Sequence, residues 1–378
     1  MITLNGPHNQ TCMKKKEIYF FIGTTAEFIK LAPIMKELRS RKVSFKIITS
    51  GQNNIRFDDL KKYTGPLKVH IAMKEKTNKS SMVNFLLWNI KTLIISMYFF
   101  RKEFSGLNKE NSYFIVHGDT ISSLLGSLIA RRYGLSLVHI ESGLRSFNFF
   151  EPFPEEICRY INTHLADLLF CPTEWAFKNV TKLKGKRINT IQNTLIEPCV
   201  WALHQPKEFD YKKKFNKYYI VIMHRQEHVY FQKEWTRDIL DFIINGAPKN
   251  INCIFILHAL TSRFLESERL NTNDEIDKRL ILLPSLPYVD FMNLMSNAEF
   301  IATDGCTNQE EAYYMGLPML ALRNLTERVE GLKKNVVISK GNEKLIRNFL
   351  KNYQKYRQPQ IPLRQKPSKI IVDYLLKN

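Results

Sequence analysis

The feature that most constrains the fold of this chain is a sequence rhythm that occurs twice along it. A short apolar run is followed by a turn that carries Gly or Asp, and the turn is followed by a helical pattern. In the first pass the apolar runs cover 17–23, 43–51, 112–120 and 135–142. Because these runs barely alternate between apolar and polar residues, they predict strands buried on both faces of a parallel sheet.

The rhythm starts again near residue 217 and predicts a second sheet. Its strands are expected at 217–224, 252–259, 279–285, 299–305 and 318–324. Two successive doubly wound α/β units follow from this pattern, with the join near 185–200. Two such units that face one another across a cleft bind their ligand beyond the carboxyl ends of the strands.

A length of 378 residues with 44% hydrophobic residues suits two domains of ordinary size. We see no internal repeat and no long low-complexity linker. We expect a loose N-terminal extension at 1–16, a first Rossmann-like domain at 17–190, a second, nucleotide-binding one at 191–360, and a C-terminal segment at 361–378 that packs back on the first domain.

Charge and cysteine content narrow the function without deciding it. Lys and Arg total 56 against 36 for Asp and Glu, so the formal charge of +20 favours anionic partners. The lysines are dispersed and no nucleic-acid module is recognisable, so we expect no nucleic-acid partner. Six cysteines without a C-x-x-C pair are typical of a reduced, cytoplasmic protein.

The most apolar stretch, 85–100, falls short of the ~20 residues that a membrane-spanning helix needs and contains Asn89 and Lys91. A buried helix is the first interpretation. Peripheral contact with an anionic membrane surface is the alternative, because Arg101 and Lys102 follow the stretch directly.

Three acidic residues come after strands at one edge of the first predicted sheet. Asp119 and Glu141 each end a strand, and Glu155 begins a helix that runs through Arg159 and His164. Each acid taken alone is explained by a helix cap or by a favourable first-turn charge. Carboxylates that converge on one sheet edge shift one another's pKa, which gives one site both an acid and a base near neutral pH.

Groups that suit an anionic ligand follow strands in both units. The Gly23 to Glu27 turn opens a helix in which Lys30 lies one turn along, although simple turn chemistry also explains that turn. His224 and His228 have the spacing of a metal pair, but no H-E-x-x-H pattern is present and we expect no metal. Positive groups at this point more naturally meet a diphosphate.

Two further segments of the second unit carry polar groups. Residues 304–311 form a strand-to-helix turn that ends in two glutamates, and Arg323, Thr326, Glu327 and Arg328 follow the last predicted strand. Arginines in such a cluster can make charge-assisted hydrogen bonds to a phosphate.

Taken in order, these segments resemble the sequence blocks of the non-hydrolysing UDP-N-acetylglucosamine 2-epimerases. The resemblance runs from about residue 17 to the C-terminus. The blocks are HGDT, HIESGLRS, PFPEE-x-x-R, HLAD followed by PTE, MHRQE, the Asp304 turn ending in QEE, GLPML and R-x-x-TER. The HIESGLR block is of the non-hydrolysing type.

The resemblance implies a GT-B fold of two Rossmann-like domains and no cofactor. It implies that the chain cleaves the anomeric C–O bond of UDP-GlcNAc and removes the C2 proton, and that re-addition of UDP then gives UDP-ManNAc for a surface polysaccharide. The catalytic residues that it implies are Asp119, Glu141, Glu155 and His224. The predicted substrate-binding residues are Lys30, Arg159, Asp304, Gly305, Cys306, Thr307, Gln309, Glu310, Arg323 and Arg328. The partners we expect are the UDP-sugar substrate and a second copy of the chain in a homodimer.

Three segments depart from the family pattern. The first turn, usually Gly-Thr-Arg-Pro-Glu, reads GTTAE, so Thr25 replaces an arginine that contacts UDP. The phosphate turn, usually Asp-Ser-Gly-Gly, reads DGCT at 304–307. The Gly-Gln-His that accompanies a regulatory UDP-GlcNAc in bacterial members is GQN at 51–53, which argues against allosteric activation.

Two alternatives to the epimerase remain open. A GT-B glycosyltransferase would use a UDP-sugar donor at the membrane surface, and the +20 charge, the 85–100 stretch and the altered phosphate turn favour it. The other alternative is a sugar-nucleotide-binding protein without catalysis.

Overall fold

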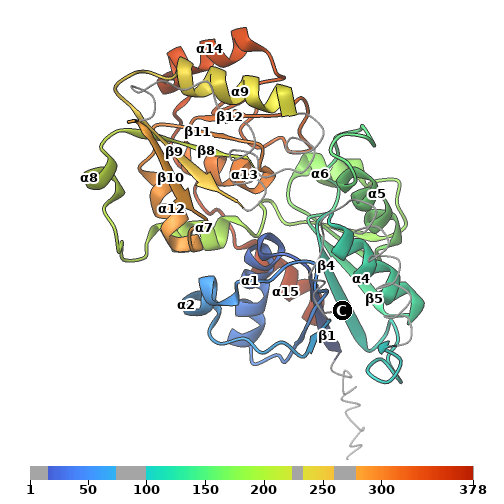
Figure 1. The fold of residues 1–378 in the computed structure, drawn as a ribbon. Helices are drawn as coiled ribbons and strands as arrows, with labels where there is room; N and C mark the ends of the chain where they lie inside the picture. Colours follow the sequence, from blue (N-terminus) through green and yellow to red (C-terminus); the bar gives the residue numbers. More distant parts are fainter. Residues whose placement is uncertain (1–15, 74–98, 224–232, 259–277, 378) are drawn as a thin grey trace, which may run out of the picture.

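The computed structural model describes residues 16–73, 99–223, 233–258 and 278–377. They form two parallel sheets with helices packed around them (Figure 1). The strands of the first sheet are β1 (Glu17–Ile22), β2 (Lys46–Thr49), β3 (Ile71–Ala72), β4 (Ser112–His117), β5 (Ser136–Ile140), β6 (Leu168–Cys171) and β7 (Lys186–Asn189). Those of the second are β8 (Tyr218–Ile222), β9 (Asn252–Leu257), β10 (Leu280–Pro284), β11 (Ile301–Thr303), β12 (Met319–Ala321) and β13 (Val336–Ile338).

The helices follow the strands in the expected alternation. They are α1 (Thr25–Ser40), α2 (Lys61–Thr64), α4 (Ile121–Arg132), α5 (Glu155–Leu165), α6 (Glu174–Asn179), α7 (Ile196–Leu203), α8 (Tyr211–Phe215), α9 (Lys233–Gly246), α12 (Tyr288–Ser296), α13 (Cys306–Met315), α14 (Glu343–Asn352) and α15 (Pro367–Lys377), with 3₁₀ turns η1 (Phe57–Leu60) and η3 (Tyr353–Tyr356).

The strand order locates the point where each sheet reverses its winding. The first sheet has the order β3-β2-β1-β4-β5-β6-β7, and the second has the order β10-β9-β8-β11-β12-β13. The winding therefore reverses between β1 and β4 and between β8 and β11. Ligands of open parallel sheets bind at such switch points.

The near-continuous apolar runs reflect strands covered on both faces. In β1, Phe20 and Ile22 pack in one core cluster together with Phe28 of α1, whereas Tyr19 and Phe21 pack in another with Leu125 of α4. The cluster that holds Phe20 also contains buried residues of both sheets, which joins the two units through apolar contacts. The predicted α/β class with two parallel sheets is confirmed.

Several sequence predictions change in detail. β3, β6, β7 and β13 were not predicted. β7 extends to Asn189, inside the predicted join. α15 packs against α1, where Arg41 pairs with Asp373 at 2.6 Å. The domain boundaries remain predictions.

The apolar stretch at 85–100 lies almost wholly outside the described residues, which begin again at residue 99. In the parts of the chain that are described, no helix combines the length and apolarity needed to cross a membrane.

Candidate active site

Glu141 stands directly after β5, in a positive-φ conformation of 67°, and its side chain is buried. Its Oε1 accepts hydrogen bonds from Lys30 at 2.6 Å, from Arg328 at 2.7 Å and from Asn193 at 2.5 Å. Lys30 comes from α1 of the first unit, and Arg328 comes from the loop between β12 and β13 of the second. The carboxylate therefore lies where the two units meet.

The charge state of Glu141 follows from this pairing. Burial raises the pKa of Glu141. The charges of Arg328, Lys30 and His117 lower it by more than burial raises it, so the pKa lies well below the usual value. Glu141 is therefore a carboxylate at neutral pH. A buried anion of this kind is available as a base only when its cations are drawn elsewhere, for example toward a phosphate.

Glu310, on α13, is the second carboxylate of this cluster. Arg328 pairs with it at 2.8 Å and Lys30 approaches it at 3.9 Å, while Tyr314 donates to its Oε1 at 2.8 Å. Burial raises the pKa of Glu310 to about 7, against the opposing effect of Arg328 and Lys30. Lys30 and Arg328 thus each bridge a carboxylate of the first unit and one of the second.

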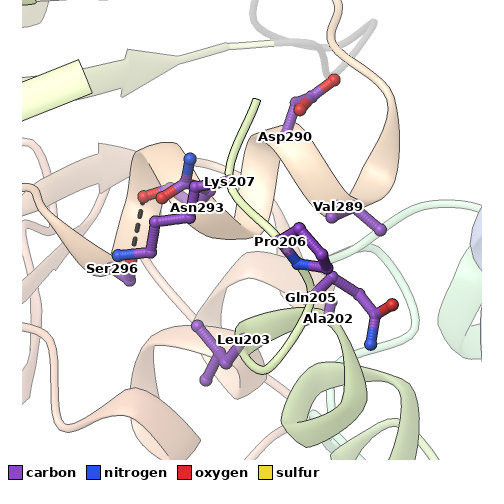
Figure 2. Close-up of a pocket in the computed structure, with 9 residues that line it drawn as sticks. All are labelled: Ala202, Leu203, Gln205, Pro206, Lys207, Val289, Asp290, Asn293 and Ser296. Atoms are coloured by element: carbon purple, nitrogen blue, oxygen red, sulfur yellow. Dashed lines mark hydrogen bonds between the residues drawn. The ribbon is translucent and has the colours of Figure 1, made fainter. Parts of the chain in front are cut away.

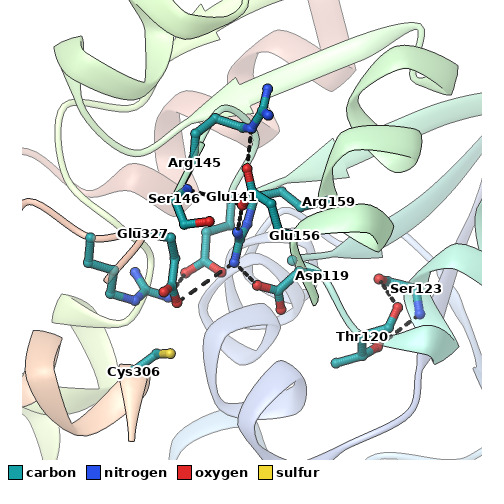
Figure 3. Close-up of polar contacts among 12 residues, drawn as sticks. Asp119, Thr120, Ser123, Glu141, Arg145, Ser146, Glu156, Arg159, Cys306 and Glu327 are labelled. Atoms are coloured by element: carbon teal, nitrogen blue, oxygen red, sulfur yellow. Dashed lines mark hydrogen bonds and ion pairs between the residues drawn. The ribbon is translucent and has the colours of Figure 1, made fainter. Parts of the chain in front are cut away.

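Asp119 is held by the buried guanidinium of Arg159, as Figure 3 shows. The helix-cap interpretation of Asp119 is wrong, because Thr120 is the N-cap of α4 and accepts from Ser123 N–H at 2.9 Å. That leaves the Asp119 carboxylate to pair with Arg159, whose Nη2 also lies 3.7 Å from Glu327 of the second unit.

Glu155 begins α5, one turn before Arg159. Burial raises the pKa of the Cys158 thiol, and the charges of Asp119 and Glu155 raise it further. Glu141 approaches the same region, because its Oε2 lies 3.3 Å from the position that a Cβ would take at Gly118, next to Asp119. The structure thus brings Glu141 close to the turn that carries Asp119. His224 falls outside the described residues.

The phosphate turn joins β11 to α13. Asp304 is buried, Gly305 is the N-cap of α13, and Cys306 and the half-buried Thr307 are its first two residues. Arg323 donates to Cys306 Sγ at 2.9 Å and to Gln309 Oε1 at 3.2 Å. The predicted second-unit residues therefore gather around the N-terminal turn of α13.

The sequence did not predict a site role for two residues of the cluster. Asn193 lies between β7 and α7 and donates to both Glu141 and Glu310, the latter at 3.3 Å. Nothing in the sequence around Asn193 distinguishes it from other loop asparagines. Glu156, fully buried, accepts from Arg145 at 2.5 Å and also pairs with Arg159. Its i,i+3 spacing from Arg159 was a usable signal.

A separate small pocket lies between the end of α7 and α12 (Figure 2). Its lining includes Ala202, Pro206, Lys207, Asp290 and Asn293. None of the predicted site residues lines it, so we do not count it as part of the candidate active site.

Comparisons with known proteins identify the family of this chain. The model of the UDP-N-acetylglucosamine 2-epimerase family matches residues 36–367. The chain belongs to this family. A UDP-N-acetylglucosamine 2-epimerase homolog of Methanococcus maripaludis is 30% identical over 354 residues, which cover 89% of this chain and 92% of the relative.

Solved structures of this family share the two-domain, GT-B-like arrangement. The S. aureus MnaA–UDP co-structure superposes with a TM-score of 0.80 at 24% identity and covers 96% of this chain and 97% of that chain. The Methanocaldococcus jannaschii UDP-GlcNAc 2-epimerase in complex with UDP-GlcNAc and UDP has a TM-score of 0.80 at 23% identity, covering 96% of this chain and 100% of that chain. At these identities the likeness shows the fold alone.

Proposed function

We propose that this chain interconverts UDP-N-acetylglucosamine and UDP-N-acetylmannosamine by eliminating and re-adding UDP. Family membership supports a UDP-GlcNAc epimerase of some kind. The observation that carries the proposal is Glu141, a buried carboxylate held by Lys30 from one unit and by Arg328 from the other. The proposed pathway role is supply of the amino sugar for a surface polysaccharide.

The proposed reaction needs a base, an acid and a stabilised leaving group. In the elimination, the C2–H and anomeric C–O bonds break, a C1–C2 double bond forms and the electron pair leaves on UDP. Return of UDP with a proton on the opposite face of C2 gives the epimer. Because the proton leaves from one face and arrives at the other, more than one carboxyl group is required.

The acids of the site can divide these tasks. Glu141 is ionised, Asp119 is held by Arg159, and Glu155 begins α5 one turn before that arginine. The N-terminal turn of α13 and the arginines at 323 and 328 present N–H donors and positive charge for the departing diphosphate. A diphosphate that draws Arg328 or Lys30 away would raise the proton affinity of Glu141 and make it a stronger base.

The experiment is to incubate the pure protein with UDP-GlcNAc in D₂O and to follow C2 by NMR. Deuterium at C2 together with a manno product is the expected result, and Glu141→Gln should prevent both. The matched control is Glu174→Gln, which removes an exposed carboxylate at the start of α6. An unchanged spectrum with the wild-type protein would overturn the proposal and favour the glycosyltransferase or the binding protein.

A further inference from the structure

The turn that lacks the family's arginine has an arginine beside it from another segment. Thr25 is the first residue of α1, and its Oγ1 accepts a hydrogen bond from the backbone N–H of Arg56 at 3.2 Å. Arg56 stands immediately before η1, thirty-one positions away in sequence. The fold therefore brings the backbone of Arg56 against the turn where the sequence pattern loses an arginine.

The segment that carries Arg56 is fixed over the switch point of the first sheet. The backbone N–H of Asn53 donates to Gly23 O at 3.1 Å, and Gln52 Oε1 accepts from the N–H of Ser122 at 3.0 Å. On the other side of Arg56, the Phe57 ring contacts Phe28 of α1 with centroids 4.8 Å apart. Arg56 is thus held against the N-terminal turn of α1 by contacts on both sides in sequence.

Arg56 also lies at the seam between the two units. Its Nε pairs with Asp59 Oδ2 at 3.2 Å, and Asp59 accepts a backbone hydrogen bond from Tyr288, the first residue of α12. The Arg56 side chain is 44% exposed. Its terminal nitrogens have no partner among the residues that the structure describes, so they can meet a ligand.

The other cations of the site are already committed to protein groups. Lys30 and Arg328 pair with Glu141 and Glu310, and Arg159 pairs with Asp119. Lys30 therefore does not simply replace the arginine lost at position 25. An arginine with an exposed head at the same turn suits this role, because a guanidinium binds phosphate oxygens through two parallel hydrogen bonds.

We propose that Arg56 is a substrate-binding residue that supplies, from the loop before η1, the phosphate contact which Thr25 cannot make. The inference rests on the proposed function, because it assumes a nucleoside diphosphate in the cleft. It adds a binding residue outside the family's sequence blocks.

The test is calorimetric titration with UDP of the wild type, Arg56→Gln, Arg56→Lys, Thr25→Arg and the double variant Thr25→Arg/Arg56→Gln. Arg56→Gln should weaken UDP binding about three- to tenfold, a range set by one partly exposed charge-assisted contact. Arg56→Lys should lose less. Thr25→Arg should tighten binding more in the Arg56→Gln background than in the wild type, because both arginines serve the same phosphate.

Three controls separate a charge effect from a structural one. Arg347→Gln removes another exposed arginine that pairs within its own helix, and it should leave UDP binding unchanged. Uridine, which carries no phosphate, should bind wild type and Arg56→Gln equally well. Thermal unfolding of Arg56→Gln should match that of the wild type.

Contrary outcomes are distinguishable. Equal UDP affinity of wild type and Arg56→Gln, or an equal gain from Thr25→Arg in both backgrounds, would overturn the role of Arg56 alone. A wild-type protein that does not bind UDP would instead remove the proposed function, and this inference with it.

Discussion

The guanidinium of Arg328 donates to the Glu141 carboxylate at 2.7 Å, across the boundary between the two units. The same guanidinium also pairs with Glu310 at 2.8 Å. A buried cation between two buried carboxylates ties the domains together by charge. The pairing also keeps the pKa of Glu141, the candidate base, low until a ligand competes for Arg328.

Replacing Glu141 by glutamine should abolish C2 exchange, with a loss of about 10²- to 10⁴-fold, the usual range for a general base. UDP binding should persist, because the substitution releases Lys30 and Arg328 from one of their two carboxylates. Deuterium incorporation and UDP calorimetry on the same preparation measure both effects. Exchange at the wild-type rate in Glu141→Gln would remove this residue from the mechanism.

Replacing Arg328 by glutamine should weaken the contact between the domains. After this change, Lys30 still pairs with both Glu141 and Glu310. Removing one partner of a buried ion pair lowers the free energy of unfolding by about 3–5 kcal/mol. The unliganded variant should therefore have a larger radius of gyration than the wild type and a lower melting temperature.

Small-angle scattering with and without UDP measures this opening, and it also tests whether the predicted 185–200 join acts as a hinge. Arg347→Gln is again the matched control, because its pair with Glu343 lies within α14. Equal radii for wild type and Arg328→Gln would show that Arg328 is not needed to hold the domains together.

Much of the fold was predictable because buried parallel strands leave a strong sequence signal. Runs such as 17–23 and 112–120 contain β1 and β4, whose residues are almost all buried. Short strands at the sheet margins leave too little signal, as β7 shows with four partly exposed residues. Pattern analysis detects the apolar runs of buried strands and misses a strand such as β7, whose residues are partly exposed.

The candidate site was predictable where residues follow strands and not where partners meet across the domains. The predicted strands located Asp119 and Glu141. The N-cap of α4 is Thr120, one residue after Asp119, which the helix-cap interpretation had assigned to that position. Local cap preferences are shared by Asp and Thr, so the sequence alone could not choose between them. The pairing of Asn193 with Glu141 depends on how two domains dock, which no local pattern encodes.

Stability should decrease as pH rises toward neutrality, because buried glutamates of the core titrate there. Burial raises the pKa of Glu311 to about 7, with Asn308 and Lys30 opposing the rise and Glu310 adding to it. A folded-state pKa above the unfolded one stabilises the fold fully below the unfolded pKa, near 4.5, and this contribution is lost as pH rises through about 7.

The variant Glu311→Gln should therefore show a flatter dependence of melting temperature on pH than the wild type in this window. Calorimetric melting at several pH values between about 4.5 and about 8 measures the slope. Glu343→Gln, an exposed glutamate of α14, should keep the wild-type slope. A slope equal to that of the wild type in Glu311→Gln would mean that this carboxyl group is ionised in the folded protein throughout the range.

Glu156 should control how well Asp119 is oriented. It pairs with Arg159, which holds Asp119, and its other contacts reach Arg145 and the backbone N–H of Ser146 at 3.1 Å (Figure 3). Glu156→Gln keeps the size of the side chain and removes its charge, so both guanidiniums lose the anionic contact that Glu156 supplies. We expect turnover to fall about tenfold or more, because small misplacements of catalytic groups are costly, while UDP affinity stays near that of the wild type.

A second readout separates this role from a general loss of stability. The loop after Arg145 places Phe147 edge-on to Trp175, with ring centroids 6.3 Å apart, and Arg145 itself lies over the Phe147 ring. If Glu156 fixes this loop, Glu156→Gln should change the fluorescence of Trp175, measured with the chain's other three tryptophans replaced by phenylalanine. Glu156→Asp, which keeps the charge, should recover part of the turnover. A positioning role would be contradicted if Glu156→Gln lost turnover without a change in Trp175 fluorescence and Glu156→Asp recovered none of it. A charge that only stabilises the fold is not expected to act through this loop.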